Sequence, residues 1–272
     1  MAAFSDGDEG GNPAGVILCD ELPATASMQS TAKEIGYSET VFATKIDGAD
    51  SWRVRYFSPE TEVPFCGHAT IALGAALAED QGAGVFNLQL NNSNITVEGA
   101  LNGELFHAAL QSPPTTSRAL NKLETAALLD LFSYRENQLE ERIAPAHIYA
   151  GADHYVLALQ NRDDLKAMTY NLQVGREFMK DHDLVTIMLV YIENNQMFHV
   201  RNAFASGGVF EDPATGAAAA AFSGYLRDIA WPHLGNINIV QGEDMKMRSK
   251  ITAEIDNLSG SSIRISGTVR VL

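Results

Sequence analysis

The chain has 272 residues, of which 46% are hydrophobic, and a formal net charge of −15 at pH 7. This length fits one large domain or two of ordinary size, and the apolar fraction excludes a disordered chain. The acidic balance argues against nucleic acid and anionic membranes as partners, because both reward Lys and Arg. Two cysteines imply no disulfide framework.

The N-terminal residues 1–11 are polar and acidic after Phe4 and do not read as a signal peptide. No apolar run approaches the roughly 20 residues that span a bilayer. We therefore expect a soluble, cytoplasmic protein.

Strand-like alternation of apolar and polar residues recurs along the chain. Phe198, Val200 and Asn202, for example, alternate with His199 and Arg201. Because many of these segments have one polar face, antiparallel pairing is favoured over a buried parallel sheet. The predicted strands lie within Val41–Ile46, Trp52–Tyr56, Phe86–Leu90, Asn94–Glu98, Leu105–Leu110, Tyr155–Leu159, Leu184–Val190, Phe198–Phe204, Ile237–Val240, Ile251–Ile255 and Thr268–Leu272.

Helical patterns are fewer, and two of them are rich in Ala and apolar almost all the way round. Such a helix is normally surrounded by protein. We therefore predict an α+β fold of two similar halves, each a curled, mostly antiparallel, barrel-like sheet around a central helix. The predicted helices are Ala24–Ile35, His68–Asp80, Ala119–Phe132, Asp163–Lys180 and Gly216–Ile229.

A duplicated motif supports two halves. The segments EVPFCGHAT (62–70) and EDPATGAAA (211–219) each place an acidic residue, a Pro and a Gly before one of the small-residue helices, 149 positions apart. A turn-prone polar linker, SPPTTS (112–117), fits a boundary between residues 1–114 and 115–262. The last strand, within 263–272, could return to the first half.

The two helix starts are candidate anion sites. Gly67 and Ala69 remove bulk, and the partial positive charge at a helix start favours a carboxylate or phosphate. The same residues would also suit tight helix packing. Since Gly216 repeats the arrangement, we predict that both starts face one cleft that holds a small anionic molecule.

Three side chains are candidates for proton transfer. His68 lies just inside the first helix start, where a neutral imidazole could relay a proton. Glu39 enters a strand among apolar residues, and desolvation would raise its pKa towards that of a general base; otherwise it is a solvated loop residue or a helix cap. Asp212 precedes Pro213, so it either caps a helix or handles a proton.

Cys66 is a further candidate, because a thiol at a helix start can act as a base or nucleophile. A two-thiol racemase would need a second cysteine in the second motif, and none is present there. Cys19 lies in an apolar run, so we predict that it is a core residue. The other histidines read as structural, and none of the seven forms an i, i+4 pair, so we predict no metal. The Gly-rich opening at 10–15 lacks a Walker Lys, and we predict no nucleotide or other cofactor.

The ordered motifs resemble the phenazine biosynthesis PhzF-like family of isomerases, which shares its fold with diaminopimelate epimerase. The resemblance implies Glu39, His68 and Asp212 as catalytic residues and places the family's Gly-His pair on Gly67 and His68. Together with the helix-start argument, it predicts that Gly67, Ala69, Gly216 and Ala217 bind the substrate. At Ala217 the family usually has Ser, so the resemblance does not carry over a substrate. The motifs are GNPAGV (11–16), YSETVFAT (37–44), RYFSPETEVPFCGHATIALG (55–74) and GGVFEDPATGAA (207–218).

These expectations combine into a cofactor-independent isomerase that shifts a proton on a small carboxylate-bearing metabolite. The alternative of a different class is a non-catalytic binder of small anions that keeps the cleft, which Ala217 favours. An exposed sheet edge would support pairing into a homodimer.

Overall fold

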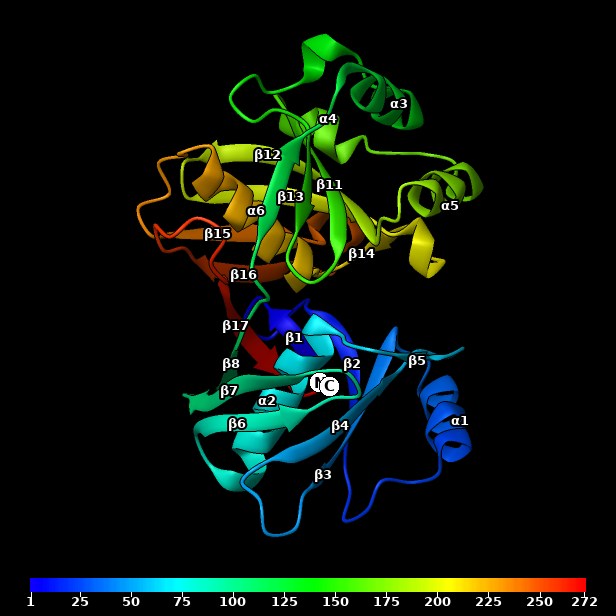
Figure 1. Cartoon of the computed structure of the whole chain (residues 1–272), viewed down its shortest axis with the longest axis vertical. Coiled ribbons are helices and arrows are strands. Elements are labelled where there is room, and N and C mark those ends of the chain that lie inside the picture. The colour runs from blue at the N-terminus through cyan, green and yellow to red at the C-terminus, as the bar shows by residue number, and fades with distance from the viewer. The chain divides into compact units, whose positions relative to one another are not determined.

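The computed structural model describes residues 1–272, which form two compact units. Unit 1 comprises Met1–Gln111 and Ser266–Leu272, and unit 2 comprises Ser112–Ile265. Figure 1 shows that each unit has a long helix with strands arranged around it. This is the mixed α+β architecture that the sequence predicts.

Most strand pairs of unit 1 are antiparallel, although β2 pairs with β3, and β4 with β6, in parallel. The strand β17 returns to this unit and pairs with β1 through Thr268, Val269 and Arg270. The elements are β1 (Ala2–Ser5), β2 (Asn12–Leu18), α1 (Thr25–Ile35), β3 (Glu39–Lys45), β4 (Trp52–Phe57), β5 (Glu62–Val63), α2 (Gly67–Gln81), β6 (Gly84–Gln89), β7 (Asn94–Asn102), β8 (Leu105–Gln111) and β17 (Arg264–Arg270).

The central helix of unit 1 is α2, and it contacts β1, β2, β3, β6, β7 and β8. Every residue from His68 to Ala78 is buried, as expected for a helix without a polar face. Its closest approach is to β7, where a Cβ built on Gly99 would lie 2.0 Å from the carbonyl oxygen of Gly74. Small residues in α2 therefore allow the sheet to close around it.

The amphipathic helix α1 covers another part of unit 1. Met28 and Ala32 pack against Phe42 and Phe57, whose rings meet edge to face. The helix ends at Gly36, whose φ of 73° lies in the left-handed region that glycine adopts without strain. That turn leads directly into β3.

Unit 2 repeats the plan with α6 as its central helix, which contacts β9, β10, β11 and β16. Parallel pairing occurs between β11 and β12 and between β13 and β15. The elements are β9 (Thr116–Ala119), α3 (Lys122–Phe132), η1 (Glu136–Gln138), β10 (Ala146–Tyr149), β11 (Asp153–Leu159), α4 (Arg162–Lys166), α5 (Leu172–Asp181), β12 (Thr186–Asn194), β13 (Met197–Ala203), η2 (Ala205–Gly207), β14 (Glu211–Asp212), α6 (Gly216–Asp228), β15 (Asn236–Gln241), η3 (Glu243–Met245) and β16 (Ser249–Glu254).

Two helix predictions in unit 2 were wrong in detail. The pattern over 163–180 is two helices, α4 and α5, because Asn171 interrupts it and accepts hydrogen bonds from the N–H groups of Gln173 and Val174 as the cap of α5. Helix α3 begins at Lys122 rather than Ala119. There Asn121 and Glu124 form a capping box, and Ala119 ends a strand instead.

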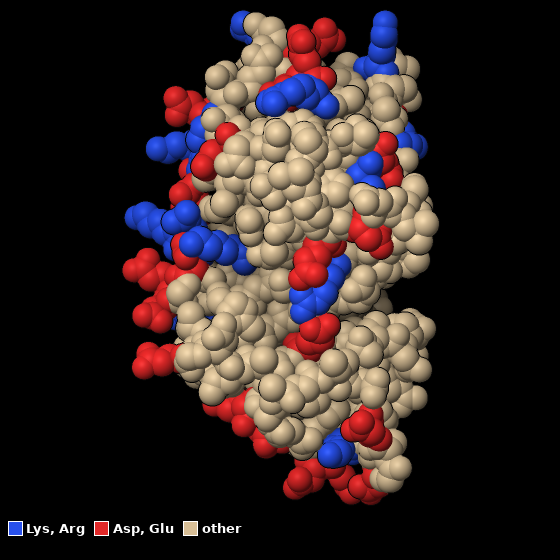
Figure 2. Space-filling model, turned by 90° about the vertical axis from the view of Figure 1, so that its left-hand side faces the viewer, with Lys and Arg blue, Asp and Glu red and all other residues tan.

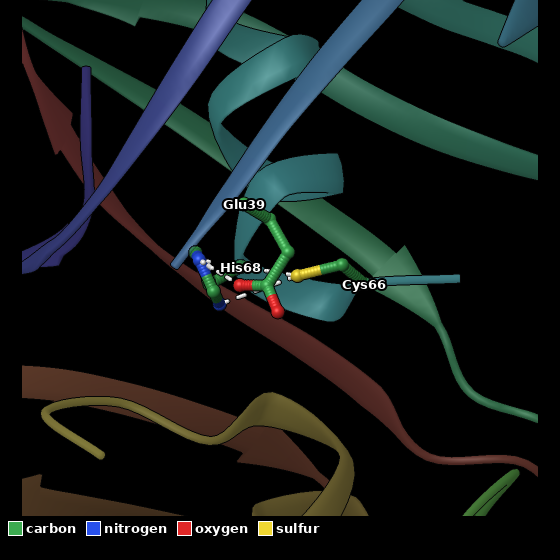
Figure 3. Close-up of side chains that lie close together, drawn as sticks. All are labelled: Glu39, Cys66 and His68. Carbon is green, nitrogen blue, oxygen red and sulfur yellow. Dashed lines mark hydrogen bonds and ion pairs between the residues drawn. The ribbon is translucent and has the colours of Figure 1, made fainter. Parts of the chain in front are cut away.

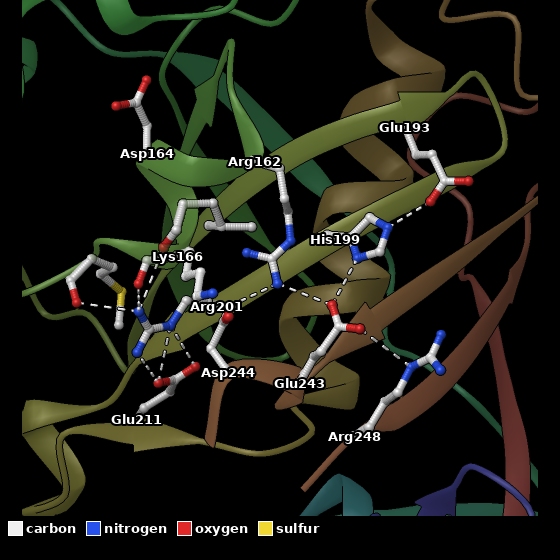
Figure 4. A network of polar contacts seen from close by, with 12 residues as sticks. Arg162, Asp164, Lys166, Glu193, His199, Arg201, Glu211, Glu243, Asp244 and Arg248 are labelled. Atoms are coloured by element: carbon white, nitrogen blue, oxygen red, sulfur yellow. Dashed lines mark hydrogen bonds and ion pairs between the residues drawn. The ribbon is translucent and has the colours of Figure 1, made fainter. Parts of the chain in front are cut away.

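Charged side chains of both signs are interspersed on the face drawn in Figure 2. A polar network runs across unit 2, in which Arg162 bonds to both Glu243 and Asp244 (Figure 4). No helix combines the length and apolar character that crossing a bilayer requires.

Candidate functional site

Three ionisable side chains of unit 1 meet at the start of α2. Oε2 of Glu39 lies 3.3 Å from Nε2 of His68, and Sγ of Cys66 lies 3.4 Å from Nδ1 of the same ring. Oγ of Ser38 also lies 3.3 Å from Nε2. Figure 3 shows the three labelled side chains pointing toward one another, Glu39 from β3 and the other two from the start of α2.

The cluster is mostly shielded from water. The side chain of Glu39 is 14% exposed, that of His68 is 8% exposed, and Cys66 is buried. The ring of His68 is within hydrogen-bond distance of the Cys66 thiol at Nδ1 and of the Ser38 hydroxyl at Nε2, while the Glu39 carboxylate makes an ion-pair contact with Nε2. The arrangement thus brings a thiol, an imidazole and a partly exposed carboxylate together.

Backbone geometry places Glu39 as the first residue of β3. In the parallel pairing of β2 with β3, Gly15 lies opposite Thr40. A Cβ on Gly15 would come within 2.6 Å of Oγ1 of Thr40, so only glycine fits there. The GNPAGV motif therefore supports the strand that carries Glu39, and it is not a phosphate loop.

Helix α2 starts without a side-chain cap. Cys66 is the N-cap residue but makes no capping bond, and the first backbone bond of the helix joins the N–H of Thr70 to the carbonyl of Cys66. The N–H groups before Thr70 thus have no carbonyl partner within the helix. Helix α6 starts in the same way, since Thr215 makes no capping bond and Ala219 donates the first backbone bond.

The structure corrects the capping interpretation of Asp212. This residue ends β14, four residues before α6 begins, and Pro213 is not the first helical residue. The Asp212 carboxylate instead accepts a hydrogen bond from the hydroxyl of Thr215. Asp212 therefore holds the turn that precedes the helix and does not cap the helix itself.

Gln241, which the sequence analysis did not select, organises this turn. Its Nε2 donates to the carbonyl of Asp212 at 2.7 Å and contacts Oγ1 of Thr215 at 3.0 Å, while its Oε1 accepts from the N–H of Thr215. The side chain is fully buried. Gln241 directly follows the predicted strand Ile237–Val240, and no local pattern marked it.

Asn202 is a second residue that the sequence analysis did not select. It lies directly opposite Asp212 in the β13–β14 pairing and is fully buried, and neither polar atom of its amide has a hydrogen-bond partner. In the sequence, Asn202 lies on the apolar face of an alternating strand pattern, and this feature could have identified it as a buried polar residue. A buried amide in this state requires a water or a ligand group to bond with.

The duplicated motif is also a structural repeat. The short strands β5 and β14, and the helices α2 and α6, begin at positions that differ by 149 residues in each case. Each unit has an Arg–Glu pair at this turn. In unit 1 the pair is Arg55 and Glu62, and in unit 2 it is Arg201 and Glu211, with an N–O distance of 2.5 Å in both (Figure 4 shows the second pair).

The predicted site residues thus fall into two groups. Glu39, His68 and Gly67 meet in unit 1, and Asp212 and Gly216 lie at the equivalent turn of unit 2. The Ala69 methyl group is fully buried, so only its backbone N–H could serve a ligand, whereas Ala217 is half-buried. Cys19, predicted as core, is half-buried just after β2, and burial raises its thiol pKa.

The chain thus has two α+β units, each with a helix that starts without a side-chain cap beside ionisable groups. The model of the phenazine biosynthesis-like protein family (PhzC-PhzF) matches residues 1–271. An uncharacterized isomerase of Mesorhizobium japonicum is 31% identical, with 94% of this chain and 90% of the relative covered. This chain therefore belongs to that family.

Solved structures share the fold. The PhzF-family phenazine biosynthesis protein of Bacillus anthracis aligns with a TM-score of 0.84 and 21% identity over 99% of this chain and 97% of its own. A predicted epimerase of Pseudomonas aeruginosa aligns with the same TM-score and 22% identity, over 100% of this chain and 95% of its own. The predicted fold class is confirmed.

Proposed function

We propose that this protein is an isomerase that moves a proton on a small carboxylate-bearing metabolite without a metal or organic cofactor. The observation that carries the proposal is the contact of Glu39 with His68 beside the uncapped start of α2. The relatives named as isomerases support the reaction class.

Each group has a distinct part in the reaction. The N–H groups at Gly67, His68 and Ala69 bind the substrate carboxylate and stabilise charge that develops when the neighbouring C–H bond breaks. Glu39 takes the proton from carbon, and His68 keeps the carboxylate oriented and passes the proton on. In unit 2, Asp212 lies beside the second helix start at Gly216 and is the candidate there for accepting or returning a proton.

The test is exchange of substrate hydrogen with deuterated water across a panel of amino and hydroxy carboxylic acids, followed by NMR. Once an exchanging compound is found, Glu39→Gln should lower its exchange rate by about 10²-fold or more, the usual contribution of a general base. The matched control is Glu34→Gln at an exposed position of α1, which should exchange at the parent rate. Near-parent exchange by Glu39→Gln would remove Glu39 from the mechanism.

Asp212 is tested by Asp212→Asn, which can still accept the Thr215 hydrogen bond. We expect a large loss of exchange with an unchanged unfolding midpoint. The double variant with Glu39→Gln asks whether both residues serve one reaction. When two residues act as a unit, the double variant loses little more activity than either single variant. If the fold losses in exchange rate of the two single variants instead multiply in the double variant, the two residues have separate roles.

The second candidate is a non-catalytic protein that binds small anions, and Ala217 favours it because the family usually has a hydroxyl there. Such a protein would bind a carboxylate from the panel, as followed by calorimetry, without any deuterium exchange. In that case Ala217→Ser should add exchange activity with little change in affinity. A two-thiol racemase, the remaining alternative, would lose all exchange in Cys66→Ser.

A further inference from the structure

We propose that Glu39, Cys66 and His68 form a binding site for Zn²⁺, and that zinc held there blocks the proton chemistry of the same side chains. Each residue offers one ligand atom, and these three atoms lie within 4.8 Å of one another. The binding part of this inference does not depend on the proposed function, whereas the inhibition does.

The donor set suits zinc. Thiolate sulfur, imidazole nitrogen and carboxylate oxygen are its common protein ligands, with bond lengths of about 2.3, 2.0–2.1 and 2.0–2.2 Å. At tetrahedral angles these bonds separate the ligand atoms by about 3.3–3.6 Å. Here Nε2 of His68 lies 3.3 Å from Oε2 of Glu39 and 3.9 Å from Sγ of Cys66. All three ligand atoms lie within 4.8 Å of one another, so zinc binding requires side-chain rotations that bring them closer together.

Charge and access also agree with this assignment. A thiolate and a carboxylate together neutralise the two charges of zinc, and the imidazole binds in its neutral form. The cluster is shielded on most sides, yet Glu39 keeps 14% of its side chain exposed and provides an entry path. Three protein ligands leave a fourth position for water, the pattern of an accessible rather than a purely structural zinc site.

Sequence spacing concealed these ligands. Cys66 and His68 are two residues apart at a helix start, and Glu39 comes from a strand that is 27 residues earlier in the chain. The prediction of no metal rested on the absence of histidine pairs with i, i+4 spacing, whereas this cluster contains a single histidine. Because the cluster contains the proposed base, Glu39, and the proposed relay, His68, zinc held there would inhibit the reaction by occupying both.

The experiment titrates Co²⁺ into the purified, reduced full-length protein and records the absorption spectrum, then displaces Co²⁺ with Zn²⁺. We expect one equivalent to produce a thiolate-to-cobalt charge-transfer band, with release of a proton because the thiol must ionise. Cys66→Ser should abolish the band, and Cys19→Ser, the matched control at the other cysteine, should retain it. Glu39→Gln removes a charged ligand, so it should weaken Zn²⁺ binding by at least about 10–100-fold, the loss that is typical when a residue supporting a ligand is changed, as measured in competition with a chromogenic chelator.

No charge-transfer band, or a band that survives in Cys66→Ser, would overturn the site. Zinc affinity in Glu39→Gln equal to that of the parent would also overturn it, and this variant keeps the carboxylate's shape so that folding is not at issue. If the band forms but one equivalent of zinc leaves deuterium exchange unchanged, the metal site stands. The assignment of exchange to Glu39 and His68 then fails.

Discussion

Gln241 donates a 2.7 Å hydrogen bond from Nε2 to the backbone carbonyl of Asp212, and thereby ties the end of β15 to the turn before α6. The same amide accepts from the N–H of Thr215. A single fully buried side chain therefore satisfies the backbone groups at both ends of this turn.

The Gln241→Leu variant should lose about 2–4 kcal/mol of the free energy of unfolding, because it leaves these buried backbone groups without partners. The measurement is urea denaturation followed by circular dichroism. Gln160→Leu is the control, since exposed Gln160 also donates to a backbone carbonyl, that of Leu139, and water can replace its bond. Equal losses in the two variants would contradict the role given to Gln241.

The repeated Arg–Glu pair provides an internal comparison of burial. The side chains of Arg201 and Glu211 are 10% and 4% exposed, against 18% and 25% for Arg55 and Glu62. Arg201→Met strands a buried carboxylate and should cost about 3–5 kcal/mol. Arg55→Met leaves a partly solvated carboxylate and should cost about 1 kcal/mol or less. Denaturation midpoints of the two variants decide this, and a larger loss for Arg55→Met would refute it.

The contact of α2 with β7 leaves no room for a methyl group. A Cβ on Gly99 would lie 2.0 Å from the backbone oxygen of Gly74, which cannot rotate away. We expect Gly99→Ala to destabilise unit 1 by about 1–3 kcal/mol or more. In Gly84→Ala the nearest atom lies 3.7 Å away on the Phe86 ring, so its thermal midpoint should stay near the parent value. A stable Gly99→Ala variant would mean that helix and sheet separate more easily than this contact indicates.

His154 makes the protein sensitive to acid. Its Nδ1 contacts Oγ1 of Thr186 at 2.7 Å, and complete burial lowers its pKa from 6.5 to about 3. The unfolded chain takes up this proton first as the pH falls, so the stability contribution is complete above about pH 6.5 and is lost progressively towards pH 3.

At pH 4.5 this loss amounts to about 2–3 kcal/mol relative to pH 7. Gln at position 154 cannot take up a proton. Between pH 7 and pH 4.5 the free energy of unfolding of His154→Gln should therefore fall by about 2–3 kcal/mol less than that of the parent. Exposed His107→Gln is the control and should follow the parent. The same pH dependence in His154→Gln and the parent would show that another group is responsible.

Much of the site was predictable from local pattern. The two Ala-rich helices and their repeated entry turns were visible because small residues and a preceding Gly are local features that report close packing. The resemblance pointed to Glu39 and His68, and the structure brings these two into contact. The contacts of Cys66 with His68, and of Gln241 with Asp212, were not visible, because they depend on side-chain direction and on segments far apart in sequence.

The sequence by itself determined that this chain has two related halves, each built around an apolar helix that begins at a glycine, since periodicity and residue size are properties of short segments. Only the tertiary structure decided which polar groups those helix starts meet. Strand register brought Asn202 opposite Asp212, and the packing of α2 against β3 set Glu39 beside His68 and Cys66. Such pairings follow from how whole elements pack in three dimensions, and no local spacing encodes them.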